Sequence, residues 1–190
     1  LRTRHHSADG RPVYLLHNPK AAGTSLKSLL GVTQPSTLHI GARDAFSRKA
    51  WREGCIVVAI RHPVARFLSG YRFHVTGPYK GALFRRHGAA LKALSPIAYL
   101  EFIQQYPEYL GPQTRWALYP DTAKPRADIV LRVEDAPRWP AQLREAGIEI
   151  EDDRLAHQNR SGAPDQECLT DEVIDAVASV YAEDFEAFGY

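Results

Sequence analysis

The chain contains 190 residues, of which 44% are hydrophobic and 24% charged, and its net charge is +2 at pH 7. This length suits one domain that buries roughly 70% of its unfolded surface, and the composition is that of an ordinary soluble globular protein. So small a charge gives no argument for nucleic acid as a partner, and two cysteines, Cys55 and Cys168, do not indicate a disulfide framework. We expect two free thiols and, since no apolar run reaches the length of a membrane span, no membrane segment.

Strands and helices alternate along the sequence, without internal repeats or low-complexity linkers. We expect strands at four apolar segments, residues 12–17, 37–40, 56–60 and 128–132. Their continuous apolar character is typical of a parallel sheet that is buried on both faces. The pattern therefore predicts an α/β fold in which helices flank a central parallel sheet of about four to five strands. We expect one domain over residues 1–190, with residues 1–11 flexible.

Helices are expected at residues 24–30, 42–51, 64–73, 96–105, 113–118, 136–146 and 171–185. Ser95 and Thr170 are good N-terminal signals for two of them, because their hydroxyls can accept a bond from a free amide of the first turn. The last helix carries an apolar stripe whose spacing indicates core packing, namely Val173, Val177, Val180 and Tyr181. Residues 77–93 have mixed signals and receive no element.

The segment at residues 13–26 has the layout of a phosphate cradle, because an apolar strand runs into a small-residue loop and then into a helix. Free amides at the helix start attract an anion, and Gly23 lets a phosphate come close to the backbone. Lys20 supplies positive charge. The glycine-lysine-serine/threonine order of nucleotide triphosphatases is absent, since Lys20 stands four residues before Thr24. We therefore expect a related but different phosphate-bearing ligand.

A second candidate phosphate site follows the apolar strand at 56–60. Arg61 stands at the carboxyl end of that strand, Pro63 opens a helix, and Ser69 lies on the same helical face as Arg66. Arg61 and Ser69 could bind one phosphate together, with the guanidinium making a bidentate contact. The alternative for Arg61 is a salt bridge at a strand end, and Arg66 suits a phosphate contact and a structural ion pair equally well.

These two segments together resemble the sulfotransferase family that uses 3'-phosphoadenosine 5'-phosphosulfate (PAPS), specifically its Golgi-type carbohydrate branch and bacterial relatives. Residues 17–25, His-Asn-Pro-Lys-Ala-Ala-Gly-Thr-Ser, look like the family's 5'-phosphosulfate loop, and residues 61–71 look like its 3'-phosphate loop. Segments at 112–116, 129–135, 157–162 and 181–190 are similar to later parts of the family, so the resemblance covers most of the chain. Two departures stand out: Asn18 replaces the usual apolar residue, and His62 replaces the usual aspartate.

The resemblance implies a P-loop-like three-layer sandwich and an enzyme that moves a sulfuryl group from PAPS to an acceptor hydroxyl, with carbohydrates or glycoconjugates as the expected acceptors. The desulfated product is adenosine 3',5'-bisphosphate, and no metal is expected. Lys20 would stabilise the charge that grows on the leaving phosphate. The implied cofactor-binding residues are Lys20, Ala22, Gly23, Thr24, Ser25, Arg61, Ser69 and Arg160. Helix capping by Thr24 and Ser25, and a solvated loop role for Arg160, are the alternatives. We expect a cytoplasmic enzyme of bacterial type, or a Golgi-lumenal one if an N-terminal anchor was trimmed.

The acceptor hydroxyl also needs a base, for which His39 is the first candidate. It lies in the region where a histidine base occurs in the uronyl 2-O branch of the family, and an imidazole suits proton abstraction at neutral pH. A histidine that merely satisfies hydrogen bonds at a strand end is the alternative. Other branches use glutamate, which makes Glu53 a candidate, and His74 and His17 follow.

Two other function classes share parts of this pattern. A nucleotide or small-molecule kinase would have a similar cradle but would need Mg²⁺ ligands, and the only acidic strand end is at residues 134–135. A non-catalytic module for anionic glycans could use a cluster of basic residues as its binding face: Lys80, Arg85, Arg86, His87 and Lys92. Magnesium-dependent ATP turnover would favour the first, and glycan binding undisturbed by adenosine 3',5'-bisphosphate the second.

Overall fold

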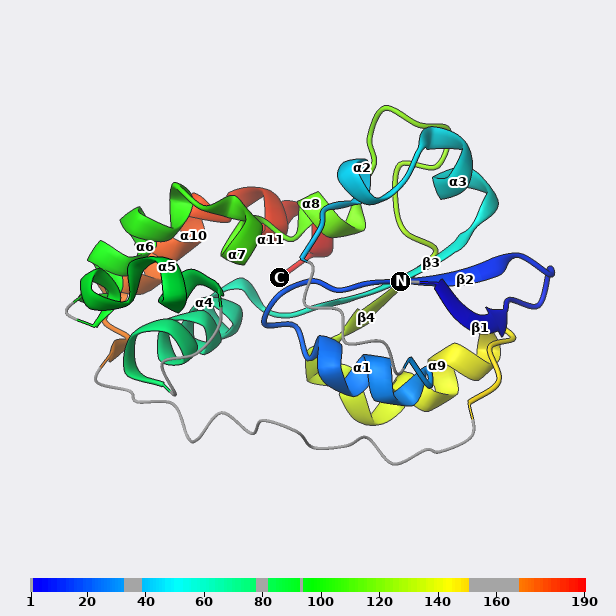
Figure 1. Cartoon of the computed structure of the whole chain (residues 1–190), viewed down its shortest axis with the longest axis horizontal. Coiled ribbons are helices and arrows are strands. Elements are labelled where there is room, and N and C mark those ends of the chain that lie inside the picture. Colours follow the sequence, from blue (N-terminus) through cyan, green and yellow to red (C-terminus); the bar gives the residue numbers. More distant parts are fainter. Residues whose placement is uncertain (1, 33–38, 78–81, 93, 151–167) are drawn as a thin grey trace. The chain divides into compact units, whose positions relative to one another are not determined.

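The structure is a computed structural model that describes residues 2–32, 39–77, 82–92, 94–150 and 168–190 (Figure 1). Contacts between residues divide the described chain into two compact units. The first unit comprises the described residues within 1–61 and 113–158, and the second those within 62–112 and 159–190. One domain over 1–190 stays a prediction of the sequence.

A four-stranded open sheet forms the centre of the first unit. Its strands lie side by side in chain order: β1 (Arg2–His6), β2 (Pro12–Leu16), β3 (Cys55–Ile60) and β4 (Ile129–Arg132). β2, β3 and β4 run parallel to one another, and each lies where the sequence predicts a strand. All six residues of β3 are buried, as expected for an apolar strand that is covered on both faces. The predicted α/β class is confirmed.

The expectation of an entirely parallel sheet is wrong, because β1 pairs with β2 in the antiparallel direction. The connection between them is too short for a crossover helix, so it can only reverse the chain. Within this turn Gly10 has a φ of 79°, and its amide donates to the carbonyl of Ser7 at 2.8 Å. The pair Asp9-Gly10 is a hairpin signal. The described residues of the segment that was expected to be flexible therefore form a strand and a tight turn.

Helices lie on both sides of this sheet in Figure 1. On one side are α1 (Gly23–Leu29) and α9 (Trp139–Glu145), the latter preceded by the 3₁₀ segment η2 (Val133–Arg138). On the other are α2 (Ala42–Ala45), α3 (Arg48–Glu53) and α8 (Thr114–Ala117). The side chains of Leu26 in α1, Leu143 in α9 and Leu15 in β2 belong to one buried apolar cluster. Burial of such side chains holds α1 and α9 against the sheet.

Two expected elements differ in the structure of the first unit. The helix predicted over 42–51 is interrupted at Phe46, which is extended because its ring packs edge to face on Tyr14 and Trp51. Ser47 then caps α3, its Oγ accepting a hydrogen bond from the amide of Ala50 at 3.1 Å. The strand expected at 37–40 is absent from its described residues, since His39 and Ile40 lie in neither helix nor strand, and residues 37 and 38 lie outside the described part.

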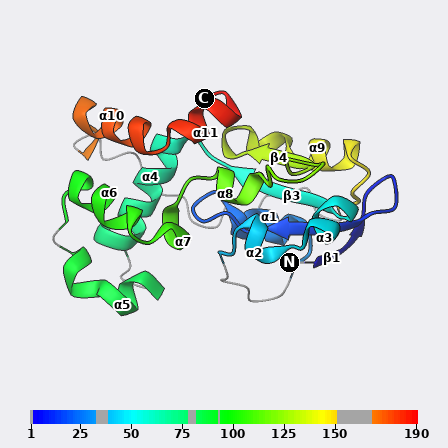
Figure 2. The same cartoon turned by 90° about the horizontal axis from the view of Figure 1, so that it is seen from above.

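The second unit is helical in its described residues. It contains α4 (Pro63–Tyr71), the π-helical turn η1 (Arg72–Thr76), α5 (Ala82–Leu91), α6 (Pro96–Gln104), α7 (Pro107–Leu110), α10 (Asp171–Val180) and α11 (Ala182–Phe188). α5 lies in the region to which the sequence assigned no element. α10 packs against α4 and α6 (Figure 2). The expected caps are confirmed, since the hydroxyls of Ser95 and Thr170 accept bonds from Ala98 and Val173 at 3.2 and 3.3 Å.

The apolar stripe of the last predicted helix packs in the core of the second unit, as expected. The helix itself is divided at Tyr181, whose φ of −109° and ψ of 26° separate α10 from α11. The Tyr181 hydroxyl donates to the carbonyl of Leu110 at 2.8 Å, which fixes this position inside the unit. Cys55 and Cys168 are free, as predicted. Within the described part of the chain, every helix is too short or too polar to cross a bilayer.

Candidate functional site

The loop between β2 and α1 has an unusual backbone. Lys20 and Ala22 have φ values of 62° and 52°, and they are the only non-glycine residues with positive φ in the part of the chain that the structure describes. For residues with a side chain this conformation costs about 1–2 kcal/mol each. Strain of this kind is concentrated at functional sites, where the surrounding structure holds it in place. The strained backbone therefore marks the loop around Lys20 as a candidate functional site of the first unit.

Helix α1 begins directly after this loop, and its first residues show which small side chain caps the helix. Ala22 is the N-cap and makes no side-chain capping bond, while its carbonyl accepts from the amide of Leu26 at 3.1 Å. Thr24 and Ser25 occupy the second and third helical positions, so neither of them is the cap residue. Thr24 is exposed and Ser25 half-buried, which leaves both side chains accessible at the surface of the loop.

Lys20 and Arg61 lie close enough to influence each other's charge. Lys20 follows β2, and Arg61 follows the neighbouring parallel strand β3, so both stand at the carboxyl edge of the sheet. Burial of the Lys20 ammonium, together with repulsion from the Arg61 guanidinium, lowers the pKa of Lys20 to about 8. An anion bound beside the two cations would oppose this shift. Lys20 and Arg61 therefore stand at the ends of adjacent parallel strands within the first unit.

A network of two amide side chains joins the segments that carry these cations. Gln113 pairs with the main chain of Arg61: its Oε1 accepts from the Arg61 amide at 2.9 Å, and its Nε2 donates to the Arg61 carbonyl at 2.8 Å. Asn18 Nδ2 donates to the same Oε1 at 3.1 Å and to the carbonyl of Ala59 at 2.9 Å. Asn18 is 1% exposed and Gln113 0%. In the sequence, Asn18 stands out as a departure from the family pattern and Gln113 falls within the similar segment 112–116, and neither of them receives a role.

His39, the first candidate for the base, contacts the loop through His17. The two imidazole rings lie nearly perpendicular, with their centroids 4.9 Å apart. The ring of His17 in turn covers Gly23, where a Cβ would come within 2.1 Å of His17 Cδ2. The structure thus brings His39 to the loop that carries Lys20, within the first unit.

Of the other candidates for the base, His17 lies in this loop, whereas Glu53 and His74 do not. Glu53 is exposed at the end of α3, just before β3, whereas Arg61 comes just after β3. The six residues of β3, a length of about 20 Å, therefore separate Glu53 from Arg61. His74 is buried in the second unit, where its Nδ1 lies 2.6 Å from the Tyr99 hydroxyl. Both positions indicate structural or surface roles for these side chains.

The remaining predicted cofactor residues belong to the second unit or lie outside the described residues. Ser69 is buried in α4 of the second unit, and Arg160 lies outside the described residues, so their roles stay predictions of the sequence. Arg66 is fully buried in that unit, where its Nη1 donates to the Gly111 carbonyl at 2.8 Å. Burial lowers the pKa of Arg66, and the nearby Asp184 opposes that shift. Of the two alternatives for Arg66, these contacts favour the structural one.

The residues that would serve the other function classes lie in η2 and in or beside α5, where the structure describes them. Glu134 and Asp135 are exposed in η2, and among the described residues no group of three metal-binding side chains occurs. In the basic cluster, Lys80 lies outside the described residues, and the ring of His87 packs on Phe102 and Tyr106 with centroids 5.3 and 4.7 Å away. His87 therefore contributes to an aromatic cluster of the second unit.

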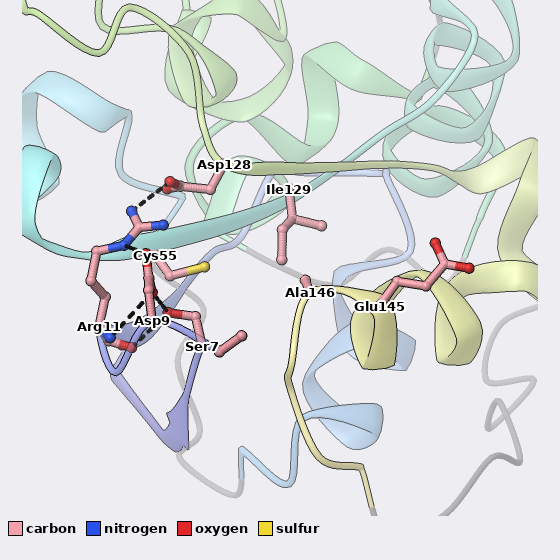
Figure 3. Close-up of a pocket in the computed structure, with 9 residues that line it drawn as sticks. Ser7, Asp9, Arg11, Cys55, Asp128, Ile129, Glu145 and Ala146 are labelled. Carbon is pink, nitrogen blue, oxygen red and sulfur yellow. Dashed lines mark hydrogen bonds and ion pairs between the residues drawn. The ribbon is translucent and has the colours of Figure 1, made fainter.

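A pocket of about 400 Å³ lies at the amino ends of β3 and β4, whereas Lys20 lies beyond the carboxyl end of β2. The pocket is lined by the β1–β2 turn, the starts of β3 and β4 and the end of α9 (Figure 3). Asp128 lines this pocket and accepts hydrogen bonds from Arg11 at 2.7 Å, from Lys124 at 2.8 Å and from the amide of Ile56 at 2.7 Å. Burial alone would raise the pKa of Asp128, but these hydrogen bonds hold it below its usual value. Burial raises the pKa of Cys55, which keeps that thiol protonated. The charges of this pocket tie the turn to the sheet.

Comparison of the chain with protein-family models, with curated proteins and with solved structures finds no match. The chemistry of the Lys20 loop is therefore what supports a functional assignment.

Proposed function

We propose that this chain is a sulfotransferase that moves a sulfuryl group from PAPS to a hydroxyl group of a carbohydrate or glycoconjugate. The observation that carries the proposal is the position of Lys20 and Arg61 at the carboxyl ends of β2 and β3, close enough for the Arg61 charge to contribute to the lowered pKa of Lys20. Open α/β sheets bind their ligands at this edge. Two cations at a strained small-residue loop suit a ligand with more than one anionic group.

Residues of the first unit would contact both phosphate-bearing ends of such a donor. Lys20 and the segment 22–25 would hold the 5'-phosphosulfate, because their backbone and hydroxyl donors line one loop. Arg61 would contact the 3'-phosphate, with Ser69 and Arg160 as its partners by resemblance to the family. A P-loop-like three-layer arrangement belongs to the same proposal, and the helices on both sides of the sheet in Figure 1 support it.

Bound PAPS would supply a sulfuryl group carried on a phosphate leaving group. Negative charge grows on that phosphate as its bond to sulfur breaks, and the Lys20 ammonium would donate a hydrogen bond to it. A preorganised donor of this kind is worth on the order of 10²–10³ in rate. With a pKa of about 8, Lys20 is still mostly protonated at neutral pH, as this role requires.

The acceptor hydroxyl loses its proton as its oxygen bonds to sulfur, and His39 would take that proton. Its contact with His17 keeps the imidazole at the Lys20 loop. General base catalysis of this type contributes roughly 10²–10⁴ in rate. His39 would return the proton to solvent after the sulfated product leaves.

Calorimetry with adenosine 3',5'-bisphosphate in the presence of a chelator tests the proposal. We expect binding without metal, and transfer of radiolabelled sulfate from PAPS to at least one class of hydroxyl acceptor. Absence of binding at millimolar bisphosphate would overturn the proposal. An absolute need for Mg²⁺, with ATP turnover, would favour a kinase, and glycan binding that the bisphosphate does not disturb would favour a binding module.

A further inference from the structure

We infer that Asn18 and Gln113 are positioning residues that hold the main chain of Arg61 at a fixed place relative to the Lys20 loop. Neither side chain needs to touch a ligand for this role. That the network matters for sulfuryl transfer rests on the proposed function. That it holds the Arg61 segment and the Lys20 loop together does not.

The bonds of Gln113 replace a missing strand neighbour. The ladder between β3 and β4 ends at Ile60 with Arg132, one residue before Arg61. At Arg61 the side-chain amide of Gln113 takes over, using one acceptor and one donor as a strand would. The backbone of Arg61 is thereby held at both of its polar groups, and the starting point of its side chain is fixed.

Asn18 makes the corresponding link on the other side of β3. The ladder between β2 and β3 ends at Leu16 with Val58, two residues before Asn18. Beyond it, Asn18 Nδ2 reaches the carbonyl of Ala59 and the Oε1 of Gln113. Since Asn18 is two positions before Lys20, the same amide group ties the Lys20 loop to the anchor of Arg61.

The burial of both amides makes the link stiff. The Gln113 Oε1 accepts two hydrogen bonds, which is its full capacity, and both side chains are shielded from solvent. Water therefore cannot replace a bond that a substitution removes, and the freed amide and carbonyl groups must shift to find new partners.

The hydrogen bonds of Asn18 and Gln113 hold the segments that carry Lys20 and Arg61, and they contribute little to the stability of the sheet. β2 and β3 are already paired along residues 13–16 and 55–58, and the side chains of β3 are buried on both faces. The amide network begins beyond the last paired residues, on the segments that carry the two cations. Losing it should leave the sheet formed and let Arg61 and the Lys20 loop move apart.

The test uses the full chain with Gln113→Met and Asn18→Leu, which keep side-chain volume nearly constant and remove the amides. Gln142→Met in α9 is the matched control, since it changes the same residue type in the same unit away from the site. Circular dichroism reports whether each variant folds. Where Gln113→Met fails to fold, Asn18→Leu alone carries the test, since it also removes an amide of the network without adding a charge.

Two readouts follow. The first is the pKa of Lys20, measured by NMR on lysine labelled with ¹³C at the carbon next to the amine and assigned with Lys20→Arg. If the network holds Arg61 near Lys20, the pKa should rise above about 8 in both variants, by the part of the shift that the Arg61 charge causes and not the larger part that burial causes, and it should stay unchanged in the control. The second is bisphosphate affinity by calorimetry, which we expect to fall about 10- to 10²-fold, the effect of losing a hydrogen bond to a charged group.

The two amides should also act as one unit. The double variant should then bind no more weakly than Gln113→Met alone. An unchanged Lys20 pKa in folded variants would overturn the inference, and so would bisphosphate affinity equal to that of the control. If the wild-type chain binds no bisphosphate, the sulfotransferase proposal fails, while the Lys20 titration still decides whether the network positions the loops.

Discussion

The ring of His17 lies directly against Gly23, so that a Cβ at position 23 would stand 2.1 Å from His17 Cδ2 and 2.3 Å from its Nε2. His17 also contacts His39, with ring centroids 4.9 Å apart. The smallest residue of the loop therefore determines where two imidazoles lie.

Gly23→Ala should push the His17 ring away and disturb both His39 and the start of α1. We expect destabilisation of about 1–3 kcal/mol, typical of overpacking, and weaker bisphosphate binding. Thermal unfolding and calorimetry measure the two effects. Gly88→Ala is the control, since that glycine lies in α5 of the second unit beside the ring of Phe84. Equal behaviour of the two variants would contradict the packing argument.

Lys20 and Arg61 should differ in what they contribute. Lys20→Ala should lower turnover about 10²-fold or more at saturating PAPS, because its hydrogen bond strengthens as charge develops. Arg61→Ala should chiefly raise the KM for PAPS. Steady-state kinetics separate these effects, and Lys49→Ala, on the exposed face of α3, serves as the control. Loss of affinity alone in both variants, with turnover intact, would refute these roles.

The lowered pKa of Lys20 predicts the pH dependence of anion binding. Below pH 8 the ammonium is charged and binding is strongest; above pH 8 the free site loses its proton, and affinity should fall as the pH rises. Calorimetry between about pH 6.5 and roughly pH 10 would show this fall. Lys20→Arg should remove it, because a guanidinium keeps its proton throughout this range.

The same shift affects stability without ligand in the opposite sense. The folded chain holds the Lys20 proton less tightly than the unfolded chain, whose lysine has the ordinary value of 10.5. Between about pH 8 and 10.5 the unfolded state therefore binds more protons, and this contribution to stability rises with pH. Lys20→Met should be more stable than the wild type at pH 7 and should lack the rise. A less stable Lys20→Met chain at pH 7 would argue against a strained, charged site.

If His39 removes the acceptor proton, His39→Ala should keep its bisphosphate affinity and lose transfer about 10²-fold or more. The wild-type rate should rise with pH through a group that titrates near neutrality. Glu53→Ala should behave as the wild type, since Glu53 stands at the far end of β3. Transfer by His39→Ala at the normal rate, with a folded but inactive Glu53→Ala, would move the assignment to the carboxylate.

Apolar runs located the three parallel strands, of which β3 is buried throughout and β2 and β4 are buried in part. The same criterion missed β1, since its residues, Arg-Thr-Arg-His-His, carry no apolar side chain. The signal for β1 lay in the turn, at Asp9 and Gly10, and not in the strand. A hydrophobic pattern therefore finds the two central strands and the apolar edge strand β4, and misses the polar edge strand β1.

The candidate site shows a similar limit. Lys20 and Arg61 could be predicted as neighbours, because each follows a strand and parallel strands share an edge. The bond between Asn18 and Gln113 could not, since it joins residues 95 positions apart and depends on tertiary packing. Asn18 and Gln113 are both buried although apolar side chains would be easier to bury, and this was the only sign that they pair with each other.

The two ends of the central sheet differ in how they respond to salt. At the amino end, Asp128 binds Arg11 and Lys124 through opposite charges, whereas at the carboxyl end Asn18 and Gln113 use neutral amides. Dissolved ions screen the first kind of contact in part, because these side chains are only partly exposed, and leave the second nearly untouched. A rise in ionic strength should therefore weaken the contacts that hold the β1–β2 turn to the sheet. The amide hydrogen bonds around Arg61 should persist, so the geometry of the candidate site should depend little on salt concentration.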